Sequence, residues 1–489
     1  MRVCLLAEGS YPYVVGGVSK WCQDLIESLP SVDFTVISLW PEPGTSGEPR
    51  YPRPRNVREV RNLYLHAGRS RRDRPPRGFE ENAQAFEEAL LTGQAAPLEG
   101  IAGGAGALLD GDGAWDRACA LYAKHAPPEL PFTEYWWTRE SILSPLVPVL
   151  EAVAPDVDVI HSISTGYAGL LAASMSRSSG IPMLVTEHGL YTRERIQELW
   201  DADWIPGEAF ARERRRPNFF KEWWKNAFLS FEKTAYAAAD PVIALFDANR
   251  QYQIAHGADE AHARVVPNGV DVAAYEAVRK RRRPSGGFHV GLVGRVVPIK
   301  DIRTFISAMK ILERKLEPGV LKAWILGPED EDPDYAAGCR DLVRLLGLEE
   351  TVAFTGRVDC RIHYETLDAV VLTSLSEGQP LSVLEAMACG IPVVASDVGA
   401  CRELLEGLER SDRALGVAGM LTPPADAEGV AAALANLAGD PVLRGSMGEA
   451  GRVRARTYYR TELVGERYLE IYRSAAARRH RRIPAAARA

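Results

Sequence analysis

The sequence predicts an α/β protein with two parallel-sheet domains. Short apolar runs alternate with amphipathic stretches along most of the chain, which is typical of buried parallel strands separated by helices. The chain has 489 residues, which is too long for one hydrophobic core. A basic stretch with proline and glycine, residues 279–287, separates two series of apolar runs. We therefore expect two α/β domains that face each other across a cleft, with this stretch as the linker.

The first series begins with a strand expected at residues 3–7 and a helix at 17–29, whose apolar positions lie on one face. The further strands of this series are expected at residues 34–39, 157–161, 183–186 and 242–244. Residues 66–150 follow neither pattern and form the expected insertion. Within it, 69–77 predicts a mobile basic loop, and the Gly/Ala-rich stretch 100–113 predicts a loose connection.

The second series begins near residue 288. Its strands are expected at residues 290–293, 323–326, 352–354, 369–372 and 393–395, with helices at 302–316 and 336–346. The two expected domains are therefore 1–278 and 288–459. The chain from Arg473 onward carries arginines among alanines, which predicts a frayed, solvated terminus; contact with anionic lipid is the alternative.

Composition excludes several classes of protein. The formal net charge of -7 argues against a general nucleic-acid binder, whose domain would be strongly basic. The 7 cysteines are scattered without a C-x-x-C pair, which fits a reducing compartment and argues against a disulfide framework or a zinc site. The first apolar run is too brief for a signal peptide, and no run of about 18 apolar residues occurs. We therefore expect a cytoplasmic protein.

Residues 376–397 carry the clearest functional pattern, a loop followed by a short helix and a strand. Gly378 lets the backbone approach a ligand, and Pro380 suits the first helical turn. The start of that helix favours an anion such as a diphosphate. Glu377 and Glu385 lie eight residues apart across the junction, and carboxylates accept hydrogen bonds from vicinal hydroxyls. The segment is suited to a charged, hydroxyl-rich ligand.

Several roles are open for these two carboxylates. In one, Glu377 binds a transferred sugar and Glu385 the ribose of a nucleotide. Glu385 could instead only complement the helix dipole. In a third interpretation the pair is the acid and nucleophile of a glycosidase.

Two cations follow another expected strand. Arg295 and Lys300 lie in residues 294–300, at the strand end where α/β domains bind ligands, and both could reach a diphosphate. The alternative is a pair of solvated loop cations. In the first domain, Gly16 and Gly17 stand at the helix start, before Val18, and permit close approach of a sugar or phosphate, although glycine pairs are also ordinary turn residues.

His188 follows the strand at 183–186 and is a candidate for polarising a hydroxyl or holding a reacting sugar. Arg193 and Arg195 are candidate phosphate or acceptor contacts, and His161, at another strand end, is a weaker candidate. Several D-x-D pairs occur, but only the acidic loop 329–334 follows a strand, and it predicts a solvated loop. We expect no metal site.

The 376–397 segment closely resembles the E-x7-E signature of retaining family 4 glycosyltransferases, which have the GT-B fold. Residues 267–271, 294–300, 354–358 and 374–403 extend that resemblance. Residues 8–18 and 186–195 are similar to the Pel exopolysaccharide glycosyltransferase group, the PelF type. The resemblance implies transfer of a hexose from a UDP-sugar, with UDP-glucose expected, to a growing exopolysaccharide or another glycan acceptor. The UDP-sugar is a substrate, and no cofactor is implied.

The resemblance also implies roles for individual residues. Arg295 and Lys300 would take the diphosphate, Glu385 the ribose, and His188 and Gly17 the reacting centre. The donor sugar would be held by Glu377, Gly378, Gln379, Pro380 and Leu381. The nucleotide base would be faced by Gly356, Arg357 and Val358. Residues 460–489 would form a helix that returns to the first domain, followed by the basic tail.

Partners and alternatives complete the expectations. The Pel resemblance implies inner-membrane polysaccharide-synthesis proteins as partners and adds peripheral association with the plasma membrane to the cytoplasmic prediction. No nucleic-acid partner is expected. A dinucleotide oxidoreductase is disfavoured because no G-x-G-x-x-G follows the first strand. The alternative function is a non-catalytic nucleotide-sugar sensor, which could dispense with His188 and Glu377.

Overall fold

The structure is a computed structural model that describes residues 1–66, 75–206, 217–281 and 286–482. These residues form two compact units. Unit 1 contains Met1–Val266 and the chain from Gly465 onward, and unit 2 contains Pro267–Val464. Both units are built around a parallel sheet.

The sheet of unit 1 has seven parallel strands in the order β3-β2-β1-β4-β5-β6-β7. The strands are β1 (Arg2–Glu8), β2 (Asp33–Trp40), β3 (Val57–Tyr64), β4 (Val159–Ser162), β5 (Met183–Glu187), β6 (Ala239–Ala244) and β7 (Ala263–Val265). Side chains 3–7 of β1 are completely buried, which explains the unbroken apolar run. The strand order reverses between β1 and β4, the position at which parallel α/β sheets bind ligands.

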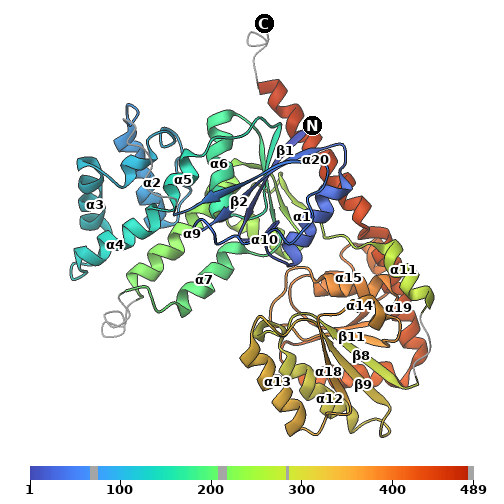
Figure 1. Ribbon diagram of the computed structural model, residues 1–489. Coiled ribbons are helices and arrows are strands. Elements are labelled where there is room, and N and C mark those ends of the chain that lie inside the picture. Colours follow the sequence, from blue (N-terminus) through green and yellow to red (C-terminus); the bar gives the residue numbers. More distant parts are fainter. Residues whose placement is uncertain (67–74, 207–216, 282–285, 483–489) are drawn as a thin grey trace. The chain divides into compact units, whose positions relative to one another are not determined.

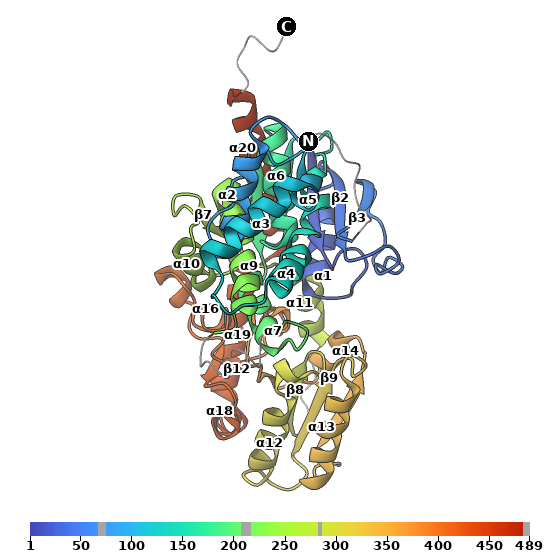
Figure 2. The same ribbon diagram turned by 90° about the vertical axis from the view of Figure 1, so that its left-hand side faces the viewer.

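The helical elements of unit 1 are α1 (Gly17–Ser28), α2 (Phe79–Thr92), η1 (Ala105–Leu108), α3 (Asp112–His125), α4 (Phe132–Leu143), α5 (Leu146–Glu151), α6 (Tyr167–Ser179), α7 (Tyr191–Asp201), α9 (Phe219–Ala238), α10 (Asp247–Ala255) and the later part of α20 (Thr461–Arg482). Helices α2 to α5, from the expected insertion, lie together (Figures 1 and 2) and pack against α6 and α9.

The insertion is an integral part of the core of unit 1. Buried Glu87 accepts hydrogen bonds from Arg117 and Arg139, which ties α2 to α3 and α4. The predicted loose connection at 100–113 is wrong, because Ala105 and Leu108 are fully buried in η1. Of the predicted mobile loop 69–77, residues 69–74 lie outside the described residues.

Helix α20 joins the two units in sequence. From Gly465 onward it packs with unit 1, where Tyr468 and Tyr472 have no exposed surface. Arg478 donates a hydrogen bond to the Asp240 carbonyl at 2.7 Å, and Arg479 to the Val157 carbonyl at 2.8 Å. The expectation of a frayed terminus is therefore wrong for these two arginines. Residues 483–489 lie outside the described residues.

The sheet of unit 2 has six parallel strands in the order β10-β9-β8-β11-β12-β13. The strands are β8 (Phe288–Val293), β9 (Leu321–Leu326), β10 (Val352–Gly356), β11 (Ala369–Leu372), β12 (Val393–Ser396) and β13 (Gly419–Thr422). The order reverses between β8 and β11, so the loops after these two strands meet at one edge of the sheet.

The helical elements of unit 2 are α11 (Val272–Arg281), η2 (Pro298–Lys300), α12 (Ile302–Glu313), α13 (Pro333–Leu345), α14 (Cys360–Tyr364), α15 (Leu381–Ala388), α16 (Cys401–Glu406), α17 (Arg410–Arg413), α18 (Ala427–Gly439), α19 (Pro441–Tyr458) and the start of α20. Helix α12 packs with α13 and α18, and α15 packs with α11, α16 and α19. Figure 1 shows α15 and α12 on opposite sides of the strands.

The unit boundary at Val266 lies earlier in the chain than the linker expected from composition. Helix α11 packs against α14 and α15, with Val278 buried, so it belongs to unit 2. Residues 279–281, expected in the linker, are the last residues of this helix, and 282–285 lie outside the described residues. Among the described helices, none is long and apolar enough to cross a membrane.

Candidate functional site

The loops after β8 and β11 bring two predicted residues of unit 2 together. Lys300 Nζ donates a hydrogen bond to Glu377 Oε1 at 2.5 Å, and Ser374 Oγ donates to the same oxygen at 2.5 Å. The side chains of Lys300 and Glu377 are only 19% and 11% exposed. At this sheet edge, Lys300 can bind an anionic group of a ligand, and the adjacent Glu377 carboxylate can accept hydrogen bonds from ligand hydroxyls.

The backbone beside Glu377 is held by close packing. The Ala400 amide donates to the Gly378 carbonyl at 2.9 Å. A Cβ at Gly399, where φ is +53°, would lie 2.2 Å from the Glu377 carbonyl oxygen, so only glycine fits there. These contacts fix the backbone of the loop that carries the Glu377 carboxylate.

The next residues of the predicted donor segment lead into α15. Gln379 is buried, and its Oε1 accepts a hydrogen bond from the Asn268 amide at 2.5 Å. Asn268 Nδ2 also donates to the Gln379 carbonyl at 3.3 Å. Pro380 occupies the N-cap position and Leu381 is the first residue of α15. Asn268 was part of a motif in the sequence, but its contact with Gln379 was not predicted.

Glu385, on α15, is held by tyrosines that the sequence analysis missed. The Tyr364 hydroxyl donates to Glu385 Oε2 at 3.0 Å. Burial and the nearby Glu385 carboxylate raise the pKa of Tyr364 well above its usual value, so its hydroxyl stays protonated as a donor. Burial and Glu385 likewise raise the pKa of Tyr275. The Glu385 carboxylate is thus oriented by phenol hydroxyls, whereas the sequence predicted only its position on the helix after the loop.

Arg295 and Arg357 lie on the surface and pair with the acidic loop 329–334. Arg295 forms an ion pair with Glu331, and Arg357 Nη2 lies 3.9 Å from Asp330 Oδ2. Asp330 and Glu331 are exposed, as expected of a solvated loop, and they also make these surface ion pairs. Arg295 makes this pair, whereas Lys300 bonds to Glu377, so the two predicted diphosphate ligands have different partners.

Glycines bring the ends of β8, β9 and β10 close together. Gly356 has φ +64°, and its carbonyl accepts a hydrogen bond from the Gly327 amide at 3.1 Å. A Cβ at Gly327 would lie 2.0 Å from the Gly294 carbonyl oxygen. Arg357 and Val358, which follow Gly356, are exposed at this edge. The predicted phosphate and base loops therefore lie along one edge of the unit 2 sheet.

In unit 1, His188 follows β5 and packs against α1. Its ring lies 4.4 Å from the Trp21 ring in an edge-on arrangement. Its Nε2 is buried and has no hydrogen-bond partner among the described residues. Burial lowers the pKa of His188 to about 3, so the imidazole is neutral near pH 7. Depending on its tautomer, the Nε2 of the neutral ring can donate or accept one hydrogen bond with a ligand.

Gly16 and Gly17 form the exposed start of α1, the helix that carries Trp21. Gly16 is the N-cap, and no side chain caps the helix. A Cβ at either position would meet no atom within 4 Å. The uncapped amides are therefore exposed at the position where the sequence predicted a ligand.

His161 is part of the core. It has no exposed surface, and its Nδ1 and Nε2 lie 2.8 Å from the Tyr472 hydroxyl and the Thr186 hydroxyl. Burial lowers the pKa of His161 to about 3. Because both nitrogens are already used inside the protein, the geometry argues against the predicted acceptor contact, and we leave His161 out of the proposed site.

Of the two candidate arginines on α7, Arg193 is exposed, and Arg195 lies over the Tyr191 ring at 5.3 Å. Arg195 Nη1 also pairs with Glu198 Oε2 at 2.5 Å. Tyr191 donates a hydrogen bond to the Glu8 carboxyl, which the sequence did not predict because the two residues are 183 positions apart. Glu8, Tyr191 and Arg195 all line a cavity of about 650 Å³.

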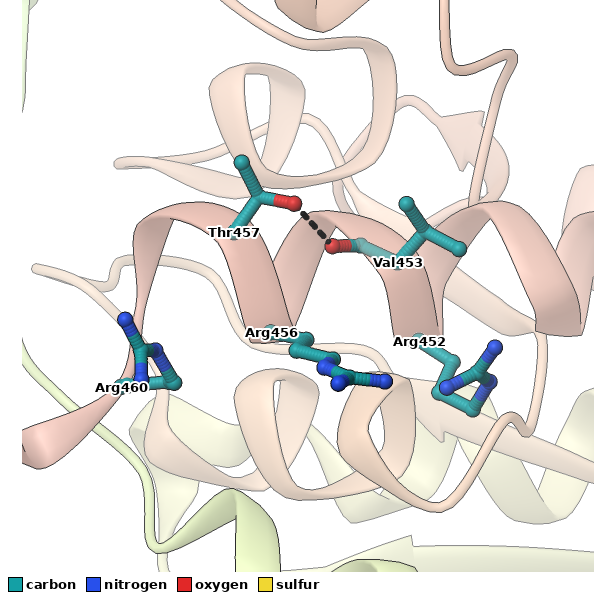
Figure 3. Close-up of a pocket in the computed structure, with 5 residues that line it drawn as sticks. All are labelled: Arg452, Val453, Arg456, Thr457 and Arg460. Atoms are coloured by element: carbon teal, nitrogen blue, oxygen red, sulfur yellow. Dashed lines mark hydrogen bonds between the residues drawn. The ribbon is translucent and has the colours of Figure 1, made fainter.

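A second cavity, of about 470 Å³, lies at the end of α19 in unit 2. Figure 3 shows Arg452, Arg456 and Arg460 along it, with the Thr457 hydroxyl donating to the Val453 carbonyl at 2.8 Å. Arg452 pairs with Glu276 at 3.2 Å and also with Glu449. None of the predicted site residues lines this cavity. Among the described residues, no three His, Cys, Asp or Glu side chains are placed to hold a metal ion.

Residues 1–261 match the family described as "Domain of unknown function (DUF3492)", which is more than half of the 489 residues. The chain belongs to this family. Residues 287–440, which contain Lys300, Glu377 and Glu385, match the family described as "Glycosyl transferases group 1". The chain thus carries a glycosyltransferase group 1 domain in its second half.

Relatives of the DUF3492 protein include two enzymes named D-inositol 3-phosphate glycosyltransferase. That of Kineococcus radiotolerans is 33% identical over 259 residues, which are 50% of this chain and 59% of the relative. That of Arthrobacter sp. is 29% identical over 313 residues, 62% of this chain and 67% of the relative. The chain thus spans about three fifths to two thirds of these relatives.

Two solved structures resemble the fold over almost the whole chain. Sucrose-phosphate synthase from Thermosynechococcus elongatus has a TM-score of 0.59 and 20% identity, covering 97% of this chain and 99% of that one. Anabaena HepE in complex with UDP has a TM-score of 0.59 and 17% identity, covering 97% and 100%. The predicted α/β fold with two Rossmann-like parallel-sheet domains of the GT-B type is confirmed.

Proposed function

We propose that this protein is a retaining glycosyltransferase that moves a hexose from a UDP-sugar, with UDP-glucose as the expected donor, to a glycan acceptor. The observation that carries the proposal is the Lys300–Glu377 pair at the β8/β11 switch point of unit 2, within a glycosyltransferase group 1 domain. The pair combines a phosphate-binding cation with a hydroxyl-binding carboxylate at the place where such sheets bind ligands.

The donor is assigned to unit 2. Lys300 binds the diphosphate, and Arg295 joins it by exchanging Glu331 for a phosphate oxygen. Glu385, oriented by Tyr364, accepts hydrogen bonds from the ribose hydroxyls. Glu377 and the backbone of 378–381 hold the donor sugar, and the loop 356–358 faces the base.

The proposed reaction breaks the bond between the sugar C1 and the diphosphate oxygen. The acceptor oxygen forms its bond to C1 on the same face, and the acceptor proton passes to the departing phosphate oxygen. The charge that grows on that phosphate is stabilised by Lys300, which is the main protein contribution. Neutral His188 of unit 1 exchanges a hydrogen bond with a hydroxyl of the reacting sugar. These groups need no metal ion in this proposal, so transfer should continue in EDTA.

The comparisons support this assignment in its coarse form. Two relatives are named glycosyltransferases, and one solved structure of similar fold is a UDP complex. The exopolysaccharide role, the inner-membrane partners and the peripheral membrane association rest on the PelF-type resemblance of residues 8–18 and 186–195, whereas the cytoplasmic location rests on the scattered cysteines.

The test is UDP release from a panel of UDP-, GDP- and ADP-sugars, with the wild type, Lys300→Ala and Glu377→Ala compared. The expected result is turnover of one UDP-sugar that each substitution lowers by about 10²-fold or more. Tight binding of a nucleotide-sugar without turnover, with glycan acceptors present, would replace the transferase by a nucleotide-sugar sensor. Absence of binding to every member of the panel would refute both functions.

A further inference from the structure

Unit 1 contains a cavity of about 650 Å³ at the carboxyl ends of its strands. We call it the aromatic pocket; the lining residues used here are Glu8, Tyr191, Arg195, Glu198, Trp204 and Trp224. Its volume is in the range of small-molecule sites, about 300–1,000 Å³. Neither His188 nor Gly16 nor Gly17 lines it, so the pocket is separate from the residues assigned to the reacting centre.

Large aromatic rings form one wall of the aromatic pocket. Trp204 is 65% exposed, and its ring meets that of Trp224 at 5.6 Å and 81°. Trp224 in turn stacks on Phe228 at 6.1 Å and 29°. Most of the Trp204 surface therefore stays in water. A ligand with a flat apolar face gains stability by burying that ring.

Polar groups interrupt the apolar lining. Glu8 accepts hydrogen bonds from the Tyr191 hydroxyl and, at 3.2 Å, from the Ala168 amide, and burial raises the pKa of its carboxyl group. The Arg195–Glu198 ion pair is partly exposed, with side-chain exposures of 43% and 61%. An alkyl chain in this pocket would desolvate these charges without replacing their hydrogen bonds.

A sugar ring has the complementary chemistry, because its flat face of C–H groups is apolar and its edge carries hydroxyls. We propose that the aromatic pocket binds neutral sugar rings of the acceptor chain behind the reacting end, with a ring face on the exposed Trp204, which buried Trp224 supports, and hydroxyls bonded to Arg195 and Glu198. This proposal rests on the proposed transferase function and adds a site that holds a chain of sugars.

The test is calorimetric titration of the full-length protein with cellohexaose, maltohexaose, glucose and 1-octanol. We expect binding of at least one hexasaccharide, and binding of glucose at least about tenfold weaker. Trp204→Ala should weaken hexasaccharide binding at least about tenfold, and Trp204→Phe should restore part of it. The matched control is Trp137→Ala on α4, which is 62% exposed but does not line the pocket, and its affinity should be unchanged.

Two results would overturn the proposal. One is binding of 1-octanol with no binding of either hexasaccharide, which would assign the pocket to an apolar ligand. The other is equal hexasaccharide affinity for the wild type and Trp204→Ala.

UDP release separates this proposal from the transferase function: Trp204→Ala should raise the KM for a long acceptor and leave UDP-sugar hydrolysis unchanged. If no UDP-sugar is bound while Trp204-dependent hexasaccharide binding persists, only the transferase function fails.

Discussion

The carboxyl edges of the two sheets satisfy their polar groups in different ways. In unit 2, Glu377 is bonded to Lys300 and Ser374, and Glu385 to Tyr364. In unit 1, the residues after β1, β4 and β5 include Ser10, Ser164 and His188. Each of these three keeps a buried polar atom without a hydrogen-bond partner among the described residues.

Charge explains the difference. A carboxylate removed from water without a partner is much more unfavourable than a neutral hydroxyl or imidazole in the same position. The charged edge of unit 2 is therefore paired before any ligand arrives, whereas the edge of unit 1 can wait for a neutral, hydroxyl-bearing ligand. Substitutions in unit 2 should then act mainly on the reaction, and those in unit 1 on stability or on binding of neutral sugars.

The largest expected effect tests the charged edge. Lys300→Ala removes the cation proposed to stabilise the departing diphosphate, and among the described residues it leaves Glu377 with only the Ser374 hydroxyl as a side-chain hydrogen-bond donor. Loss of one such stabilising group typically lowers kcat about 10²–10³-fold. The measurement is UDP release at saturating donor, with the thermal midpoint recorded to confirm folding.

Lys310→Ala is the matched control for Lys300. Lys310 lies on α12 of the same unit and pairs with Glu313 at 2.9 Å, away from the β8/β11 loops. Its kcat should be unchanged. A Lys300→Ala enzyme that is folded and as fast as the wild type would remove the basis of the comparison, because the paired edge would then have no part in the reaction.

The second prediction concerns how the stability of unit 1 depends on pH through the buried carboxyl group of Glu232. Both carboxyl oxygens of Glu232, on α9, are buried without a partner among the described residues, and burial raises its pKa to about 8. The folded state therefore keeps a proton that the unfolded state releases above about pH 4.5. Stability should fall as pH rises from about 4.5 to about 8, by at most about 1.4 kcal/mol per pH unit.

Glu232→Gln removes this titration. Its free energy of unfolding in urea, relative to the wild type, should increase by about 2–3 kcal/mol between pH 5 and pH 7. Glu222→Gln on the same helix is the control, because Glu222 is partly exposed and pairs with Lys225; its difference should stay constant. If the Glu232→Gln difference were also constant, the carboxyl group would not be held protonated in unit 1.

The third prediction concerns the hydrogen bonds that α20 gives to the first sheet. Tyr472→Phe leaves the buried His161 Nδ1 without its partner, which should lower the free energy of unfolding by about 1–3 kcal/mol. Tyr468→Phe is a matched control, because the Thr186 hydroxyl keeps its bond to His161. It should have the smaller effect on urea unfolding. A larger loss for Tyr468→Phe would show that the Tyr468–Thr186 hydrogen bond contributes more to stability than the Tyr472–His161 hydrogen bond.

The sequence predicted the charged edge better than the neutral one, for a physical reason. Lys300, Glu377 and Glu385 lie in local patterns at strand and helix ends, so their positions could be inferred from short segments. The hydrogen bonds at the unit 1 edge, in contrast, join segments that are far apart in the sequence. Glu8 and Tyr191 are 183 residues apart, and His161 and Tyr472 are 311 apart, which no local pattern encodes.

Most strands were predicted, and the missed ones share a position. β3 and β13 are edge strands, and only Val57 of β3 is fully buried. β7, also at an edge, has only three residues. Apolar runs predict strands that are buried on both faces, so edge strands are harder to predict, although the edge strand β10 was predicted. Likewise, the arginines at the end of α11 indicated a linker, although its other face packs against α14 and α15.

The smallest expected effect tests whether pairing in unit 2 extends to its surface. Arg295 pairs with Glu331, and both side chains are 50% exposed, so the ion pair contributes at most about 1 kcal/mol. Arg295 must leave Glu331 to reach a diphosphate. Glu331→Gln should therefore lower the KM for the donor by a few-fold, whereas Arg295→Gln should raise it about tenfold with a smaller change in kcat. Glu329→Gln is the control in the same loop, because Glu329 pairs with Arg340, and its KM should not change. An increase in KM for Glu331→Gln would mean that Glu331 itself contacts the donor, and the paired surface would then belong to the site rather than compete with it.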